Sequence, residues 1–525
     1  MSMTILLFLL AGDWAGAKAA AEQALKAEDP VARRHAVERL AEHDRRESVD
    51  LLLKLHAAST GRIAALMAEV ERRSIEAKPA PPQGPSAQDL QRHSQQMLKN
   101  LREGKPMPPP PGSTPRKLEE LPGEYGRIET ERGIQARIVA VLAAMKDPKG
   151  RQAILEALSG AKDWPERFAA AKILAALGEA DDPVLKALRK SLGSERDPRV
   201  LIASIDALVA LKDKGAVEVI GGLLSAKDWF VRIAAAEGLA GLGSPEAIPL
   251  LVEALRTAEG REVEAFNAAL VKLAGVDCRG NPSAWKDWWE SHREEILAGT
   301  YVPPKAPEGG ARGTQVTFYG IPVVSLRVVF VLDVSGSMKD RAGWKPDPGQ
   351  IPTGEDRKEL EGIGDRKIDV ALFELRRAVR NLPEETRFNI VLYNEGYKVW
   401  REEGLAPASK SNKRDALKFT ERIDPDGGTN FFEALERAFH VHDAGEKDPE
   451  LARMRTGADT IYMLSDGRPT VGRLTHPDNI LERVAEMNRE RRIAIHTVAV
   501  GAEIDRDFMR RLAEEHGGTF VHMNR

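Results

Sequence analysis

The chain has 525 residues, a net charge of −3, 42% hydrophobic residues and 30% charged residues. This composition is typical of a multidomain globular protein, and the near-neutral charge gives no overall attraction to nucleic acid or anionic membranes. The single cysteine, Cys278, excludes an intramolecular disulfide framework and any zinc cluster built from several cysteines.

The N-terminus begins with an apolar run, "MTILLFLLAG", followed by the small residues Ala15–Ala17. This pattern predicts a signal peptide over residues 1–17 and export to the periplasm, cell envelope or extracellular space. No Lys or Arg precedes the run and the run is short, so a first amphipathic helix in a cytoplasmic protein is the alternative. No later segment has the roughly 18 apolar residues that a membrane span requires.

The first half of the chain is repetitive. Segments that start at Asp163, Asp197 and Asp228 each have an Asp followed by Ala and Leu at helical spacing, with a period of about 30 to 35 residues. Paired helices at such a period stack into an α-solenoid, because one pair cannot bury its own apolar face. The pattern resembles HEAT repeats over residues 134–297 and, more loosely, over residues 18–75.

Two features mark the limits of this solenoid. Trp285, Trp288 and Trp289 lie at helical spacing in "WKDWWESHREEI", which predicts a helix that caps the last repeat. Residues 76–133 are rich in proline and read as a linker around one short helix. Residues 298–325 are expected to form a second linker that ends in a strand and turn.

From residue 326 to residue 525, short apolar strands alternate with amphipathic helices, which predicts a doubly wound, Rossmann-like α/β domain. Ligands of such domains bind beyond the C-terminal ends of the parallel strands. Three loops expected at that edge carry oxygen-bearing side chains: "DVSGSM" with Asp333, Ser335 and Ser337, "DGGTN" with Thr429, and "MLSDG" with Asp466. Two carboxylates and three hydroxyls suit Mg²⁺, Mn²⁺ or Ca²⁺ better than Zn²⁺.

These three loops, in this order, resemble the metal-ion-dependent adhesion site (MIDAS) of von Willebrand factor type A (VWA) domains. The resemblance implies that Ser335, Ser337 and Thr429 offer hydroxyls to the metal and that Asp333 and Asp466 bind it directly or through water. One coordination position would remain for an acidic residue of a partner protein. The chain departs from the family pattern at residues 339–366, which separate the first loop from the next helix and could form a specificity loop or a tolerated insertion.

The sequence therefore predicts a protein-interaction protein that is not an enzyme, with the helical repeats as a second binding surface. One alternative is RNA binding, because the Ro autoantigen family also joins helical repeats to a domain of this type. Acidic residues slightly outnumber basic ones between residues 134 and 297, which argues against a nucleic-acid partner. The other alternative is a cytosolic partner of a chaperone-like ATPase. His496 stands alone in a predicted strand and is interpreted as structural.

Overall fold

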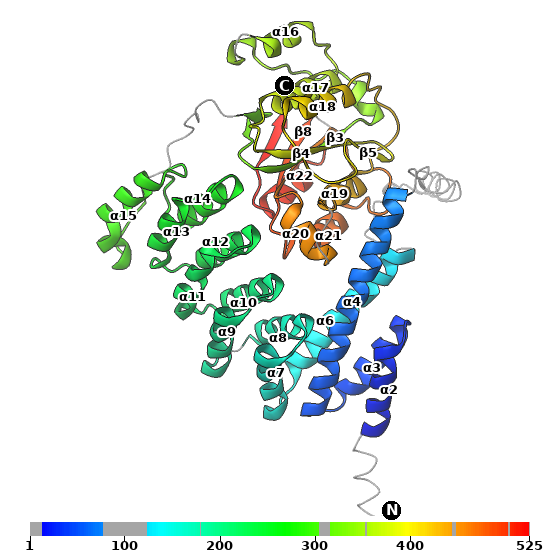
Figure 1. Cartoon of the computed structure of the whole chain (residues 1–525), viewed down its shortest axis with the longest axis vertical. Coiled ribbons are helices and arrows are strands. Elements are labelled where there is room, and N and C mark those ends of the chain that lie inside the picture. The colour runs from blue at the N-terminus through cyan, green and yellow to red at the C-terminus, as the bar shows by residue number, and fades with distance from the viewer. Residues whose placement is uncertain are drawn as a thin grey trace, which may run out of the picture. The chain divides into compact units, whose positions relative to one another are not determined.

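The computed structural model divides the chain into two compact units, one helical and one α/β. Figure 1 shows the elements of both units. The structure describes residues 13–76, 123–178, 180–303, 316–351, 354–443, 448–501 and 504–523.

The helical unit is a stack of antiparallel helix pairs in two layers. In one layer α3, α6, α8, α10, α12 and α14 contact one another in turn, and in the other α7, α9, α11, α13 and α15 do so. This arrangement confirms the predicted solenoid. The helices are α2 (Trp14–Lys26), α3 (Pro30–Ala41), α4 (Arg46–Glu76), α6 (Gly123–Ala144), α7 (Pro148–Gly160), α8 (Trp164–Leu177), α9 (Asp182–Ser194), α10 (Pro198–Ala210), α11 (Val217–Gly221), α12 (Trp229–Leu242), α13 (Ala247–Leu255), α14 (Arg261–Ala274) and α15 (Pro282–Leu297).

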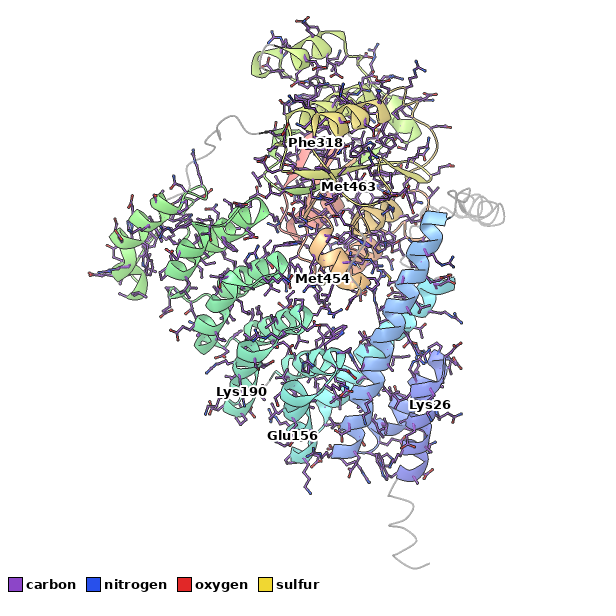
Figure 2. The ribbon with its side chains drawn as sticks, viewed as in Figure 1. Lys26, Glu156, Lys190, Phe318, Met454 and Met463 are labelled. Atoms are coloured by element: carbon purple, nitrogen blue, oxygen red, sulfur yellow. The ribbon has the colours of Figure 1, made fainter. Side chains whose placement is uncertain are left out.

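Each repeat begins where the sequence placed an Asp. Of the three, Asp197 accepts the backbone N–H of Arg199 and so satisfies a donor that the helix leaves unpaired, whereas Asp163 and Asp228 precede α8 and α12 without a side-chain cap. The apolar spacing of these segments predicts six core residues. Leu177 at the last position of α8 is only half-buried, and the other five are buried: Leu174, Ile205, Leu208, Leu239 and Leu242. Glu156 and Lys190 lie on the exposed faces of α7 and α9 (Figure 2).

The boundary predicted at residue 134 is wrong, because α6 already begins at Gly123. The residues assigned to the end of the linker are helical since Ile128 is buried in the stack and Glu131 pairs with Arg33 of α3. This ion pair ties the N-terminal helices to the repeats across a long stretch of sequence. The helix predicted inside the linker lies outside the described residues.

The tryptophan-rich helix α15 closes the solenoid as expected. Trp285 is fully buried, and its indole N–H donates to Asn267 Oδ1 at 2.8 Å. Trp288 stacks on His292 of the same helix and lies edge-on to Tyr301. Trp289 is only half-buried, so the anchor of this cap is Trp285.

The α/β unit is built on a seven-stranded sheet of order β5-β4-β3-β7-β8-β9, with β6 beside β4. Strands β3, β4, β7, β8 and β9 are parallel, and β5 and β6 run antiparallel to β4. Met463 lies on β7 and Phe318 on a separate hairpin of β1 and β2 (Figure 2). The strands are β1 (Thr317–Phe318), β2 (Ile321–Pro322), β3 (Arg327–Asp333), β4 (Arg387–Tyr393), β5 (Tyr397–Val399), β6 (Ala406–Pro407), β7 (Thr460–Ser465), β8 (Ala494–Val500) and β9 (Phe520–Met523).

Helices flank this sheet, and the chain order of strands and helices confirms the predicted doubly wound fold. The strands bury nearly continuous apolar runs, as expected for a sheet covered on both faces. The chain passes from β3 to β4 on one side and later to β7 on the other, so the topological switch point lies at β3. The helices are α16 (Glu355–Gly362), α17 (Lys367–Asn381), α18 (Lys410–Phe419), α19 (Phe431–Phe439), α20 (Pro449–Thr456), α21 (Pro477–Asn488) and α22 (Arg506–Glu514).

The insertion at residues 339–366 is attached to the body of the domain. Ile351 and Leu360 pack on Phe373 of α17, and Trp344 packs against the main core. Arg380 of α17 forms ion pairs with Asp356 and Glu359. The sequence showed this segment only as polar and rich in proline and glycine, because its few apolar anchors are widely spaced.

Candidate metal centre

The site begins at the last residue of β3. Asp333 lies in the middle of the sheet, paired in register with Tyr393 of β4, and its side chain is fully buried. One carboxylate oxygen accepts the backbone N–H of Ser335 at 2.8 Å, and the other accepts the hydroxyl of Ser465 at 2.8 Å. The switch-point topology thus delivers one buried carboxylate to the C-terminal edge of the sheet.

The first and second loops are held together through their backbones. The amide of Gly336 donates to the carbonyl of Gly427 at 3.0 Å, and the amide of Asp426 donates to the carbonyl of Val334 at 3.0 Å. A Cβ atom on Gly336 would lie 3.4 Å from the Gly427 oxygen, so the backbones of the two loops lie in direct contact here. The second loop therefore reaches the site from a position almost a hundred residues later in the chain.

The third loop joins the first through side chains. The Ser337 hydroxyl donates to Asp466 Oδ1 at 2.8 Å and lies 3.2 Å from the Ser335 hydroxyl. A Cβ atom on Gly467 would lie 3.8 Å from Thr429 Oγ1 and 3.9 Å from Ser337 Oγ, so all three loops meet there.

The structure thus brings together all five residues that the sequence singled out. Asp333, Ser335, Thr429 and Asp466 are buried, and Ser337 is exposed. The half-open site therefore has its carboxylates on the inside and a hydroxyl at its mouth.

Burial and mutual repulsion dominate the electrostatics of the site. Burial and, after it, the nearby negative charge of Asp466 together raise the pKa of Asp333 to about 6, against hydrogen bonds from Ser335 and Ser465 that lower it. A divalent cation between these two carboxylates would remove this penalty, because it favours the charged form of both.

Two polar residues at the site were missed by the sequence analysis. The ammonium group of Lys367 lies 2.8 Å from Asp466 Oδ2, and Thr470 Oγ1 accepts the backbone N–H of Thr429 at 2.8 Å. Lys367 is the first residue of α17, immediately after the insertion, so no motif spacing links it to Asp466. Thr470 lies shortly after Asp466 in the chain, and no motif in the sequence marks it as a residue of the site.

The donor set fits a hard cation. In the part of the chain that the structure describes, no group of three or more His, Cys, Asp or Glu residues could hold a metal. The site here combines two carboxylates with three hydroxyls, and oxygen donors of this kind suit Mg²⁺, Mn²⁺ or Ca²⁺. Residues able to hold such an ion are Asp333, Ser335, Ser337, Thr429 and Asp466.

His496, which the sequence analysis interprets as structural, makes contacts within the sheet. His496 stacks on Tyr462 with ring centroids 4.7 Å apart, and its Nδ1 accepts the backbone N–H of Thr519 at 3.0 Å. These contacts explain its burial in β8 without a ligand.

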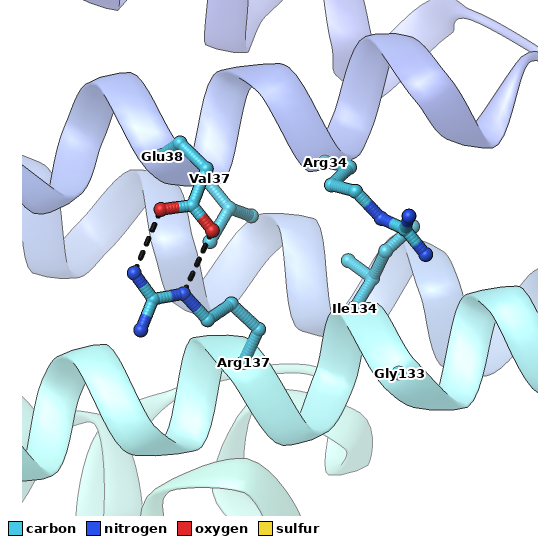
Figure 3. A pocket seen from close by; sticks show the side chains of 6 residues that line it. All are labelled: Arg34, Val37, Glu38, Gly133, Ile134 and Arg137. Carbon is cyan, nitrogen blue, oxygen red and sulfur yellow. Dashed lines mark hydrogen bonds and ion pairs between the residues drawn. The ribbon is translucent and has the colours of Figure 1, made fainter.

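The helical unit has a shallow cavity of its own, of about 250 Å³, between α3 and α6 (Figure 3). Arg137 closes one side of this cavity with a two-pronged ion pair to Glu38, with both hydrogen bonds 2.7 Å long. These hydrogen bonds join α3 to α6, so the residues around the cavity hold the helical stack together. Its lining residues are Arg34, Val37, Glu38, Gly133, Ile134 and Arg137.

No helix in the described part of the chain combines the length and apolar character needed to cross a membrane. The apolar run at the N-terminus lies outside the described residues. Helix α2 begins at Trp14, and Ala17 in its first turn is buried. The cleavage site predicted after Ala17 therefore lies within the first turns of α2.

Family models match both halves of the chain. The HEAT repeat model matches residues 129–209 and 185–270, and the VWA domain model matches residues 369–522. The VWA match begins after the loop of Asp333 and after the insertion, in agreement with the departure seen in the sequence.

Inter-alpha-trypsin inhibitor heavy chains are similar to part of the chain. Heavy chain H2 of Homo sapiens is 30% identical over 228 residues, which are 43% of this chain and 19% of that protein. Heavy chain H4 of Homo sapiens is 28% identical over 224 residues, 43% of this chain and 20% of that protein. The chain thus spans about a fifth of the length of the curated relatives it matches.

Solved structures give weaker similarities. A VWA protein from Catenulispora acidiphila has a TM-score of 0.28 at 18% identity, over 39% of this chain and 40% of that one. The Ro protein of Deinococcus radiodurans has a TM-score of 0.19 at 16% identity, over 89% of this chain and 83% of that one. Scores this low support no structural argument. The family models show that the chain joins HEAT repeats to a von Willebrand factor type A domain.

Proposed function

We propose that this protein binds a partner protein through a divalent cation held in its VWA domain. Asp333, Ser335, Ser337, Thr429 and Asp466 hold Mg²⁺, or Mn²⁺ or Ca²⁺ in its place, as an intact MIDAS. The partner presents an acidic side chain that completes the coordination of the ion. The helical repeats provide a second surface for the assembly, and the protein acts after export from the cytoplasm.

The observation that carries this proposal is the convergence of three loops on two buried carboxylates. Strands β3 and β7 are neighbours in the sheet. Asp333 is the last residue of β3, Asp466 follows the last residue of β7, and both side chains are buried. Burial of negative charge is costly, and Lys367 balances only one of these two carboxylates, so a further cation is expected to neutralise the pair. Hydroxyl groups on the same loops supply the neutral oxygens that a six-coordinate ion also requires.

The exposed position of Ser337 supports a role in binding. It leaves the mouth of the site open to a ligand, while Asp333 at the back is closed off by Ser465 and the sheet. An ion held by these residues would leave a coordination position for a group from outside the chain. In this proposal the ion serves as a contact point between two proteins and performs no reaction.

A capture experiment tests the proposed function. The full chain and its Asp466→Ala variant are immobilised and exposed to host extract with Mg²⁺ or with a chelator. We expect partners that the unsubstituted chain retains only with Mg²⁺ and that the variant does not retain. The matched control is Asp415→Ala, which removes a 54% exposed carboxylate of α18 and is expected to leave retention unchanged. If the same partner proteins are retained in the presence of the chelator and by Asp466→Ala, metal-dependent binding is contradicted.

A further inference from the structure

Lys367 is fixed beside the metal centre by the base of the insertion. Its backbone N–H donates to the carbonyl of Asp340 at 2.8 Å, and the amide of Ala342 donates to Asp365 at 2.8 Å. An antiparallel bridge joins Arg341 and Arg366. Backbone hydrogen bonds therefore join the two ends of the insertion. Lys367 is the next residue in the chain and the first residue of α17.

The side chain of Lys367 forms an ion pair with a residue of the site. Its ammonium group lies 2.8 Å from Asp466 Oδ2, and the exposed fractions of the two side chains are 12% and 0%. A second carboxylate, on the largely exposed Asp340, is 3.7 Å away. A Cβ atom on Gly501, which has a φ of +95°, would lie 3.2 Å from Lys367 Cε, so glycine leaves room for this side chain.

Both oxygens of Asp466 are thus engaged within the protein. Oδ1 accepts the hydroxyl of Ser337, and Oδ2 accepts Lys367. An ion that binds Asp466 directly must share it with a fixed positive charge. The same positive charge lowers the cost of burying Asp466 beside Asp333 when no ion is bound.

We propose that Lys367 is the built-in counter-cation of this site: it stabilises the metal-free domain and opposes binding of the divalent ion. This inference rests on the proposed function, because it takes Asp466 as a residue that holds the metal. The insertion then has a role, since it positions the charge that tunes the affinity of the site. Lys367 is a positioning residue and is not itself a ligand.

Lys367→Met tests this role, because it keeps the length of the side chain and removes its charge. We expect the metal-free variant to melt at a lower temperature than the unsubstituted chain, since Asp466 loses its partner. We expect its affinity for Mg²⁺ to rise on the order of tenfold, since a positive charge a few ångströms from the ion is gone. Opposite signs for stability and affinity separate this role from a structural one, which would lower both.

Lys339→Met is the matched control. Lys339 lies in the same region, but its ammonium group is 3.5 Å from Asp424 and both side chains are largely exposed, so the pair is screened by water. We expect little change in metal-free melting or in Mg²⁺ affinity. Lys367→Arg keeps the charge and is expected to recover part of the metal-free stability.

The measurements are thermal melting with a chelator or saturating Mg²⁺, and calorimetric titration with Mg²⁺ alone. The inference is supported if the melting temperature of Lys367→Met is lower than that of the unsubstituted chain, if this difference becomes smaller in Mg²⁺, and if the variant binds Mg²⁺ more tightly. Mg²⁺ binding by the unsubstituted chain with no change in Lys367→Met overturns the role of Lys367 alone. If the unsubstituted chain does not bind Mg²⁺, the proposed function is overturned. The proposed opposition of Lys367 to metal binding is then overturned as well.

Discussion

At the residue scale, the state of Asp333 links the site to pH. Its pKa of about 6 is above the usual value for an aspartate, because the side chain is buried and faces Asp466. Protonation of Asp333 therefore favours the folded metal-free form, and this contribution is present near pH 4 and is lost as pH rises through 6. Binding of a cation needs the charged carboxylate, so Mg²⁺ affinity should fall as pH drops below 6.

Melting curves across this range test the pH dependence. We expect the metal-free chain to be less stable than Asp333→Asn above pH 6, with the gap closing toward pH 4. The comparison with Asp333→Asn removes the effects of the other acidic groups, which titrate in both proteins. A gap that stays constant between pH 4 and pH 7 would contradict the raised pKa.

Ion pairs in the helical unit give a second prediction at this scale. Arg33 and Glu131 join α3 to α6 with side chains that are 0% and 3% exposed, and Arg137 and Glu38 join the same helices with side chains that are 48% and 50% exposed. Removal of one partner of a buried pair costs about 3–5 kcal/mol, and an exposed pair contributes about 0–1 kcal/mol. We expect Arg33→Met to lower the free energy of unfolding far more than Arg137→Met does.

Urea denaturation of the two variants decides this point. Equal losses of stability in Arg33→Met and Arg137→Met would mean that burial does not distinguish the pairs. The chain provides this comparison unusually well, because both arginines connect the same two helices.

At the element scale, the cap helix α15 can be tested by its tryptophans. Trp285 is fully buried and bonded to Asn267, whereas Trp289 on the same helix is half-buried. Truncation of a buried tryptophan typically costs about 3–5 kcal/mol. We expect Trp285→Ala to destabilise the solenoid by this amount and Trp289→Ala to have a much smaller effect. A larger loss in Trp289→Ala, measured by denaturant unfolding, would place the anchor elsewhere.

Elements with strong periodicity could be predicted from the sequence, and those held by distant contacts could not. The strand "VVFVLD" and the helix from Lys367 read correctly because their apolar patterns are local. The start of α6 was misplaced because proline-rich sequence precedes it, and its partner Arg33 is 98 residues away. Helix α16 was missed since its main apolar contact, through Leu360, is to another element.

The candidate site shows the same division. Its five oxygen-bearing residues could be selected because each follows a strand or precedes a helix in a recognisable order. Lys367 could not, since only the folded insertion brings it to Asp466. Its pairing partner is 99 residues later in the chain.

At the scale of the whole molecule, the N-terminus offers a test of export. Cleavage after Ala17 would remove the first turn of α2, including Trp14, which lies edge-on to His43, and the buried Ala17 itself. Mass spectrometry of the protein from its native host would show a start at Lys18 if export by this signal occurs. An intact N-terminus would contradict export by this route and agree with the helix that the structure shows from Trp14.

The central claim is that three loops of the VWA domain form one divalent-cation site, and a calorimetric titration with Mg²⁺ tests it most directly. We expect the unsubstituted chain to bind one Mg²⁺, Thr429→Ala to bind more weakly, and Asp466→Ala to bind least, because it loses a charged oxygen donor. The Asp415→Ala control should match the unsubstituted chain. Undiminished Mg²⁺ affinity in Asp466→Ala would contradict the account, because the loops would then not share an ion.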